Sequence, residues 1–95
     1  MDTLHDATAK RIARKFGVEY NRGQGPDIET RQLVIEVETN DTSREAYRQL
    51  QGFDKPVHIA GANLYATLSA LVYTLRTTIG VMEPDGNIRK ESSRG

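Results

Sequence analysis

Three acidic residues have the types and the spacing that a divalent cation requires. Asp27 stands at the start of an extended segment, and Glu36 and Glu38 lie near the end of the apolar run 33–39. Residues two apart on a strand point to the same face, so Glu36 and Glu38 project together. If the two segments form a hairpin, Asp27 lies beside them, and three oxygen donors converge on one point. Hard cations such as Mg²⁺ bind such donors, so the sequence predicts a metal site there.

The same acids also have an ordinary structural interpretation. Two acids spaced i and i+2 on a strand usually lie on the solvated face of a half-buried sheet, and Asp before a strand is usually a turn residue. Val34 shares the face of Glu36 and Glu38, however, so that face is not simply polar. The opposite face is strongly apolar and carries Leu33, Ile35 and Val37. Neighbouring like charges repel each other, and a bound cation would relieve that repulsion.

Length and composition set the limits within which this site must be built. The 95 residues predict one domain, residues 1–95, and the 13 basic and 13 acidic residues give a net charge of zero. This balance argues against a strongly basic nucleic-acid coat protein, but it allows an enzyme with a local basic patch. The chain has no cysteine, which excludes disulfides and thiolate metal sites. With no signal-peptide pattern and no apolar run near the ~20 residues of a membrane span, we expect a cytoplasmic protein without membrane contact.

Hydrophobic periodicity and turn residues divide the chain into alternating helices and strands. Helices are expected over residues 3–16, 43–52 and 63–76. Strands are expected over residues 18–20, 26–30, 33–39 and 56–60, followed by a hairpin over 78–82 and 87–91. Strands that alternate with helices predict an α/β domain in which helices cover both faces of a mixed sheet.

This order, with Pro26-Asp27 before a strand that carries Glu36-Val37-Glu38, resembles the PD-(D/E)XK nuclease superfamily, which has a restriction-endonuclease-like or Holliday-junction-resolvase-like fold. Members share a helix, a three-strand meander, a second helix and a fourth strand. The resemblance covers roughly residues 3–60, and residues 61–95 would be an extension. It implies Mg²⁺- or Mn²⁺-dependent cleavage of phosphodiester bonds in DNA, or in RNA as an alternative.

The resemblance assigns roles to the motif residues. Asp27 and Glu36 match the two motif acids, both metal ligands, and the carbonyl of Val37 would complete the coordination. Glu38 stands where the family usually has lysine, which is the main departure from the pattern. A carboxylate there would act as a base for the attacking water or help to hold a second metal, since it cannot stabilise an anionic transition state directly. The expected catalytic residues are therefore Asp27, Glu36 and Glu38.

Other residues are candidates for supporting roles. Gln49 matches a glutamine often seen near the site in related nucleases, and His5 or Asp6 would supply the acid-bearing position of the first helix. Each has a simpler interpretation, as an exposed helix residue or, for Asp6, as a helix cap. The expected contacts to the phosphate backbone are Lys10, Arg14, Arg22 and Arg44. His58 alternates with apolar residues in its strand and is expected at the surface.

The third helix carries leucines at three- and four-residue spacing: Leu64, Leu68, Leu71 and Leu75. Such a stripe is most simply part of the core, and the alternative is a dimer seam. A small nuclease that cuts both strands of a duplex commonly needs two sites, which favours a homodimer.

Three hypotheses for function follow. The first is a compact Mg²⁺-dependent endonuclease-like domain. The second is a catalytically inactive module with the same fold that binds nucleic acid or a protein partner, as the neutral net charge and Glu38 favour. The third is a plain α/β interaction domain whose acids are surface residues.

Overall fold

The first helix begins and ends where its capping residues require. The computed structural model describes residues 2–40 and 43–94 of the chain. Helix α1 spans Leu4–Lys15, and the Thr3 side chain accepts the backbone N–H of Asp6 as the N-cap. Gly17 ends the helix with a φ of 72°, a conformation that costs glycine little. The buried side of the helix consists of Thr8, Ala9, Ile12 and Ala13.

Five strands and two further helices follow α1 in the chain. Their order is β1 (Ile28–Glu29), β2 (Val34–Glu38), α2 (Ser43–Gln49), β3 (Val57–Gly61), α3 (Leu64–Tyr73), β4 (Gly80–Met82) and β5 (Ile88–Lys90). The strands form one sheet in chain order, β1-β2-β3-β4-β5. The central strands β2, β3 and β4 are parallel, while β1 and β5 pair antiparallel at the edges. The sheet is therefore mixed, as the sequence predicted.

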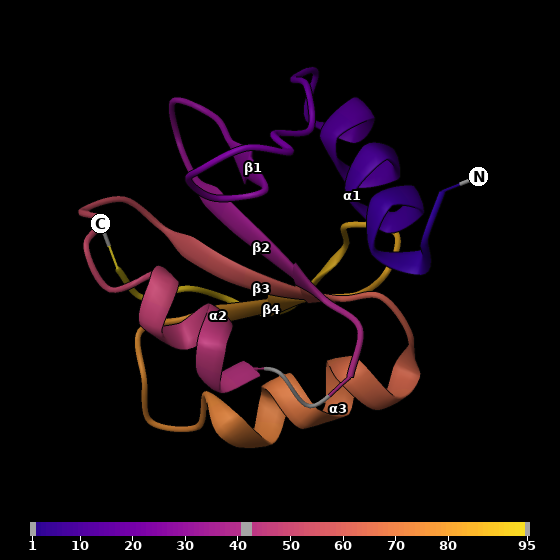
Figure 1. Ribbon diagram of the computed structural model, residues 1–95. Coiled ribbons are helices and arrows are strands. Elements are labelled where there is room, and N and C mark those ends of the chain that lie inside the picture. Colours follow the sequence, from indigo (N-terminus) through magenta and orange to yellow (C-terminus); the bar gives the residue numbers. More distant parts are fainter. Residues whose placement is uncertain (1, 41–42, 95) are drawn as a thin grey trace.

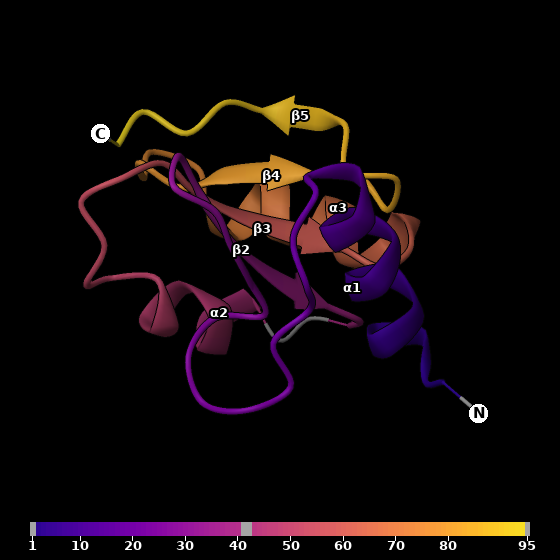
Figure 2. The same cartoon turned by 90° about the horizontal axis from the view of Figure 1, so that it is seen from above.

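Helices cover both faces of this sheet (Figure 1). Two crossovers that advance in the same direction along a sheet place their helices on the same side, so α2 and α3 lie together. On the other face, α1 packs against Ile35, Val37, Ala60 and Met82. Helices α2 and α3 enclose a second core with Val34, Val57, Ile59, Ile79 and Val81. The turned view shows β5 at one edge of the sheet and α1 across its face (Figure 2).

Close packing at the end of β3 fixes the start of α3. A Cβ added at Gly61 would lie 2.4 Å from the backbone nitrogen of Thr67, so only glycine lets the helix approach this strand.

At the other end of α3, the Lys90 Nζ donates to the carbonyl oxygens of Thr74 at 2.7 Å and Ile79 at 2.6 Å. A cation at a helix C-terminus is favourable for the unpaired carbonyls there.

No helix in the described ranges is long and apolar enough to cross a membrane.

Three expectations from the sequence are wrong in whole or in part. Residues 18–20 form no strand, because the chain leaves α1 through a hydrogen bond from Val18 to the Ala13 carbonyl and then runs irregularly to β1. The leucine stripe of α3 is core at only one position: Leu71 is partly buried and packs against the core under α2 and α3, whereas Leu64, Leu68 and Leu75 are exposed. The buried residues of this helix are instead small, namely Ala66, Thr67 and Ala70.

His58, expected at the surface, is also misplaced by the sequence pattern. It is only 2% exposed and lies between Ile35 and Gly80 on the neighbouring strands. Neither ring nitrogen has a hydrogen-bond partner in the described part of the chain. Burial lowers the pKa of His58 to about 4, so the ring is neutral at neutral pH.

Replacing His58 with Leu is expected to stabilise the fold and to flatten its acid dependence. The unpaired imidazole costs about 1–3 kcal/mol on burial, and Leu removes that cost. Because the pKa of His58 is lower in the folded state, its contribution is complete above about pH 6.5 and is lost as the pH falls toward 4. Urea denaturation at pH 7 and pH 5 measures both effects. Equal pH dependence in the two proteins would show that His58 does not titrate on unfolding.

Candidate functional site

The register of β1 and β2 brings Asp27 beside Glu36. Ile28 pairs with Ile35, so the next opposed position joins the two acids. At this position carboxylate oxygens accept the backbone N–H groups of the two chain segments. Asp27 donates its N–H to Glu36 Oε1 at 3.0 Å, and Val37 donates its N–H to Asp27 Oδ2 at 2.8 Å. Each carboxylate therefore satisfies a backbone N–H of the opposite segment, and these two hydrogen bonds hold both acids in position. The expected hairpin is confirmed.

The acids open onto a cavity of about 280 Å³ between the 21–25 loop, the end of β2 and α2. It brings together six of the residues that the sequence singled out: His5, Asp27, Glu36, Val37, Glu38 and Gln49. The remaining lining residues are Gly23, Gly25, Thr39 and Glu45. Residues from four separate segments therefore meet at one concave, mostly polar place.

Burial and the repulsion between neighbouring carboxylates raise the pKa values of Glu36 and Glu38. Glu36 is only 4% exposed, and burial, followed by the charge of Asp27, raises its pKa to about 8. Burial also raises the pKa of Glu38 to about 7, with smaller contributions from Asp27 and Glu45. Groups with such pKa values near neutrality are typical of functional sites. The interpretation of Glu36 as an ordinary solvated residue does not fit its burial.

A hydrogen-bonded chain connects Asp27 to α1. His5 Nε2 lies 3.1 Å from Asp27 Oδ2, and His5 Nδ1 lies 3.1 Å from the Tyr20 hydroxyl. That hydroxyl donates its one proton to Asp6 Oδ1 at 2.8 Å, which lowers the pKa of Asp6 and leaves the hydroxyl oxygen as an acceptor for His5. The chain of hydrogen bonds therefore links the Asp27 carboxylate through His5 and Tyr20 to Asp6 on α1.

The expected phosphate contacts lie outside the cavity. Lys10 is exposed and pairs with Asp2 at 3.0 Å. Arg22 lies over the Tyr20 ring at 5.2 Å and within 3.7 Å of Asp6, at the side of the hydrogen-bonded chain. Arg14 is exposed near the end of α1. The side chain of Arg44 lies outside the described part of the structure.

Two residues at or beside the cavity, Glu45 and Tyr20, were not predicted from the sequence. Glu45 stands one helical turn before Gln49 on α2, and residues four apart share a helix face, so the choice of Gln49 could have drawn attention to Glu45. Tyr20 gave no such signal, because its role depends on the irregular path between α1 and β1.

The donor chemistry of the cavity suits a hard divalent cation. Its acids and the Val37 carbonyl are oxygen ligands, which Mg²⁺ and Mn²⁺ prefer. In residues 2–40 and 43–94, however, no three acidic or histidine side chains already surround a single point as a metal would require. Oδ2 of Asp27 and Oε1 of Glu36 accept backbone N–H groups, and a side-chain hydrogen bond between Asp27 and Glu36 contributes to the raised pKa of Glu36. The groups that would hold a metal here are Asp27, Glu36, Glu38 and the Val37 carbonyl.

Comparison of the chain with models of known families, with curated proteins and with solved structures found no match.

Proposed function

We propose that this chain is a metal-dependent endonuclease-like domain of the PD-(D/E)XK type that hydrolyses phosphodiester bonds in DNA. The observation that supports it is the meeting of Asp27, Glu36 and Glu38 at one cavity, beside the Val37 carbonyl and Gln49. The helix, the β1–β2 hairpin, α2 and β3 follow one another in the order that the superfamily shares, although the hairpin has two strands instead of three. The restriction-endonuclease-like arrangement is part of this proposal.

In this proposal the ligands are Asp27, Glu36 and the carbonyl of Val37. A bound Mg²⁺ or Mn²⁺ would neutralise phosphate charge and lower the pKa of an attacking water. His5 positions Asp27 by its hydrogen bond to Oδ2, and the Val37 N–H holds the same oxygen from β2. These two contacts hold the Asp27 carboxylate in place beside Glu36.

Glu38 is assigned the role of general base. A base is most effective when its pKa lies near the working pH, and the pKa of about 7 meets that condition. The Glu38 carboxylate would take a proton from the attacking water and pass it to solvent at the open side of the cavity. Gln49, from α2, would orient the water by hydrogen bonding, since its amide can both donate and accept.

DNA would approach along the face that carries Arg22, Lys10 and Arg14. Contacts from such residues to phosphates position a nucleic acid without reading its sequence. Arg22 lies beside the hydrogen-bonded chain that reaches Asp27, through its contacts with Tyr20 and Asp6. RNA would meet the same charges, so the cleavage test includes both nucleic acids.

The direct test is incubation of the purified protein with labelled duplex, branched and single-stranded DNA and with single-stranded RNA. Each is assayed with Mg²⁺, with Mn²⁺ and with EDTA. We expect cutting of at least one DNA substrate with either metal and none in EDTA. Cutting that persists in EDTA, or no cutting of any substrate by folded, metal-bound protein, would contradict the proposal.

One observation favours a second candidate, an inactive module that binds nucleic acid or protein through the same fold. Among the described residues that line the cavity, none is Lys or Arg, and Glu38 occupies the position of the usual lysine. Without a cation the cavity would repel phosphate. Retention of labelled DNA without cleavage, in the same assay, identifies this candidate.

A further inference from the structure

The outer face of α3 is an apolar stripe without a single charge. Four side chains of the helix form it, and Leu75 extends it in the turn just beyond the helix end: Leu64, Tyr65, Leu68, Val72 and Leu75 are 71%, 61%, 48%, 71% and 64% exposed. At 100° per residue the four helical positions fall within about 100° of one another around the helix axis. Residues 62–75 contain no acidic or basic residue, whereas 27% of the chain is charged. We call these five side chains the α3 stripe.

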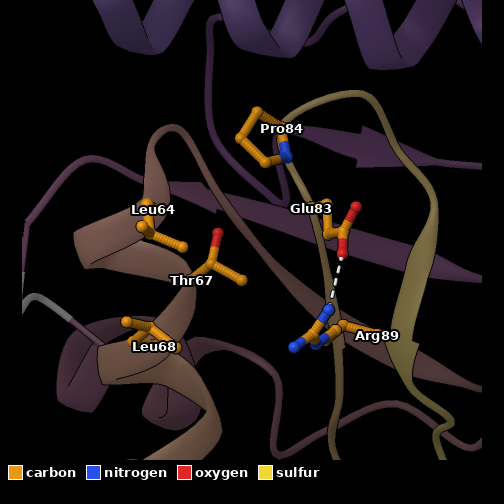
Figure 3. Close-up of a pocket in the computed structure, with 6 residues that line it drawn as sticks. All are labelled: Leu64, Thr67, Leu68, Glu83, Pro84 and Arg89. Atoms are coloured by element: carbon orange, nitrogen blue, oxygen red, sulfur yellow. Dashed lines mark hydrogen bonds and ion pairs between the residues drawn. The ribbon is translucent and has the colours of Figure 1, made fainter.

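A groove runs along one side of the α3 stripe. It has a volume of about 280 Å³ and lies between the start of α3 and the β4–β5 turn. Figure 3 shows Leu64, Thr67 and Leu68 on its helical side and Pro84, Glu83 and Arg89 opposite. Glu83 and Arg89 form an ion pair of 3.2 Å at the open rim. Protein–protein interfaces commonly combine an apolar centre with a polar or charged rim, as this groove does.

We infer that the α3 stripe binds a second copy of this chain, with the two α3 helices crossing antiparallel about a twofold axis. In such an isologous interface each patch meets itself, so a face of like charge would repel its copy. The α3 stripe has no charge to repel. Its exposure in the monomer is the kind of extended apolar surface that marks an interaction site.

The area agrees with a dimer of moderate stability. Free side chains of this size expose roughly 200 Å² each, so the five present on the order of 600 Å² per copy. Complete burial of the five side chains in both copies would remove at most about 1,200 Å² from solvent, which is the lower end of the range for specific interfaces. The groove adds area at the rim, where it can receive an apolar side chain from the copy.

The charges at the two ends of α3 favour the antiparallel orientation. Arg76 follows the helix and is exposed, whereas Glu83 lines the groove at the start of the helix. Antiparallel crossing places the Arg76 of one copy near the Glu83–Arg89 ion pair of the other, where Arg76 can share the Glu83 carboxylate with Arg89. It also opposes the two helix dipoles, which is favourable compared with parallel pairing.

Analytical ultracentrifugation of the full chain tests the pairing. We expect the wild-type protein at micromolar concentrations to have twice the 10.6 kDa mass of one chain. Leu68→Glu and Val72→Glu are each expected to weaken the dimer at least ~100-fold, because the symmetry buries two unpaired charges. Leu4→Glu is the matched control: Leu4 is 49% exposed on α1, against 48% for Leu68, and its variant should remain dimeric. Circular dichroism confirms that each variant folds.

Disulfide cross-linking tests the orientation in a chain that has no cysteine of its own. A mixture of Leu64→Cys and Leu75→Cys chains should form the mixed disulfide faster than either chain alone forms its own. Faster self-linking of each chain would overturn the antiparallel arrangement. A monomeric wild-type protein, or a dimer that Leu68→Glu leaves intact, would overturn the pairing and assign the α3 stripe to a different partner. Neither result depends on whether the chain cleaves DNA.

Discussion

Replacing Asp27 with Asn is expected to lower the rate of Mg²⁺-dependent DNA cleavage on the order of 10³-fold or more. Asn keeps the size of the side chain and still accepts the Val37 N–H, so the strand end remains paired. It removes the negative charge that a cation requires and weakens the contact with His5. Single-turnover rates on the preferred substrate, measured with saturating Mg²⁺, report this change without interference from product release.

Asp54→Asn is the control for the charge change. Asp54 is exposed and lies between α2 and β3, away from the cavity, so its replacement should leave the rate unchanged. Raising the Mg²⁺ concentration should rescue Asp27→Asn only in part, because a ligand is lost. If Asp27→Asn cleaved as fast as the Asp54→Asn control, Asp27 would not be a metal ligand.

Without metal, the free energy of unfolding is expected to fall as the pH rises from 6.5 to 8. The pKa values of Glu36 and Glu38 are about 8 and 7 in the folded protein, above the ordinary value of 4.5. Raised carboxyl pKa values contribute stability that is complete below about pH 4.5 and is lost as the pH rises through 7 and 8. His58 opposes this trend only below pH 6.5, where its contribution is lost. Ionised carboxylates crowded at the cavity therefore destabilise the fold at alkaline pH.

The Glu36→Gln and Glu38→Gln double variant should remove most of this dependence. Gln is uncharged at every pH, so thermal unfolding in EDTA should give nearly equal midpoints at pH 6.5 and pH 8. Mg²⁺ should raise the midpoint of the wild-type protein at pH 8 and leave the variant unchanged, since ligand binding to the folded state stabilises it. A wild-type midpoint that does not fall with pH would contradict the raised pKa values.

The sequence predicted the sheet and most of the cavity because both depend on local patterns. The period-two run 33–39 fixed the strand and its two faces, and the turn residues fixed the hairpins. Asp27, Glu36 and Glu38 could be placed together because antiparallel pairing follows from a short connection. Gln49 was placed near the site only by the resemblance to the nuclease superfamily, because its position depends on how α2 packs beside the end of β2.

The sequence could not predict features that depend on packing between distant segments. Periodicity assigned four leucines of this segment to the core, yet only Leu71 packs there, beside the buried Ala66 and Ala70. A helix with small residues on one side and leucines on the other has apolar residues all round, so hydropathy alone cannot choose the side that packs. His58 is buried because Gly80 leaves room beside it on the next strand, a relation between segments 22 residues apart. Tyr20 hydrogen-bonds His5 and Asp6 from an irregular segment, so no strand pattern could predict its position.

Calorimetric titration of the protein with Mn²⁺ at pH 8 determines whether the three carboxylates bind a metal. We expect saturable binding to the wild-type protein, proton release that grows as the pH is lowered toward 7, and binding lost in Asp27→Asn but kept in Asp54→Asn. No binding to the wild-type protein, or equal binding to both variants, would show that Asp27, Glu36 and Glu38 do not form a metal site.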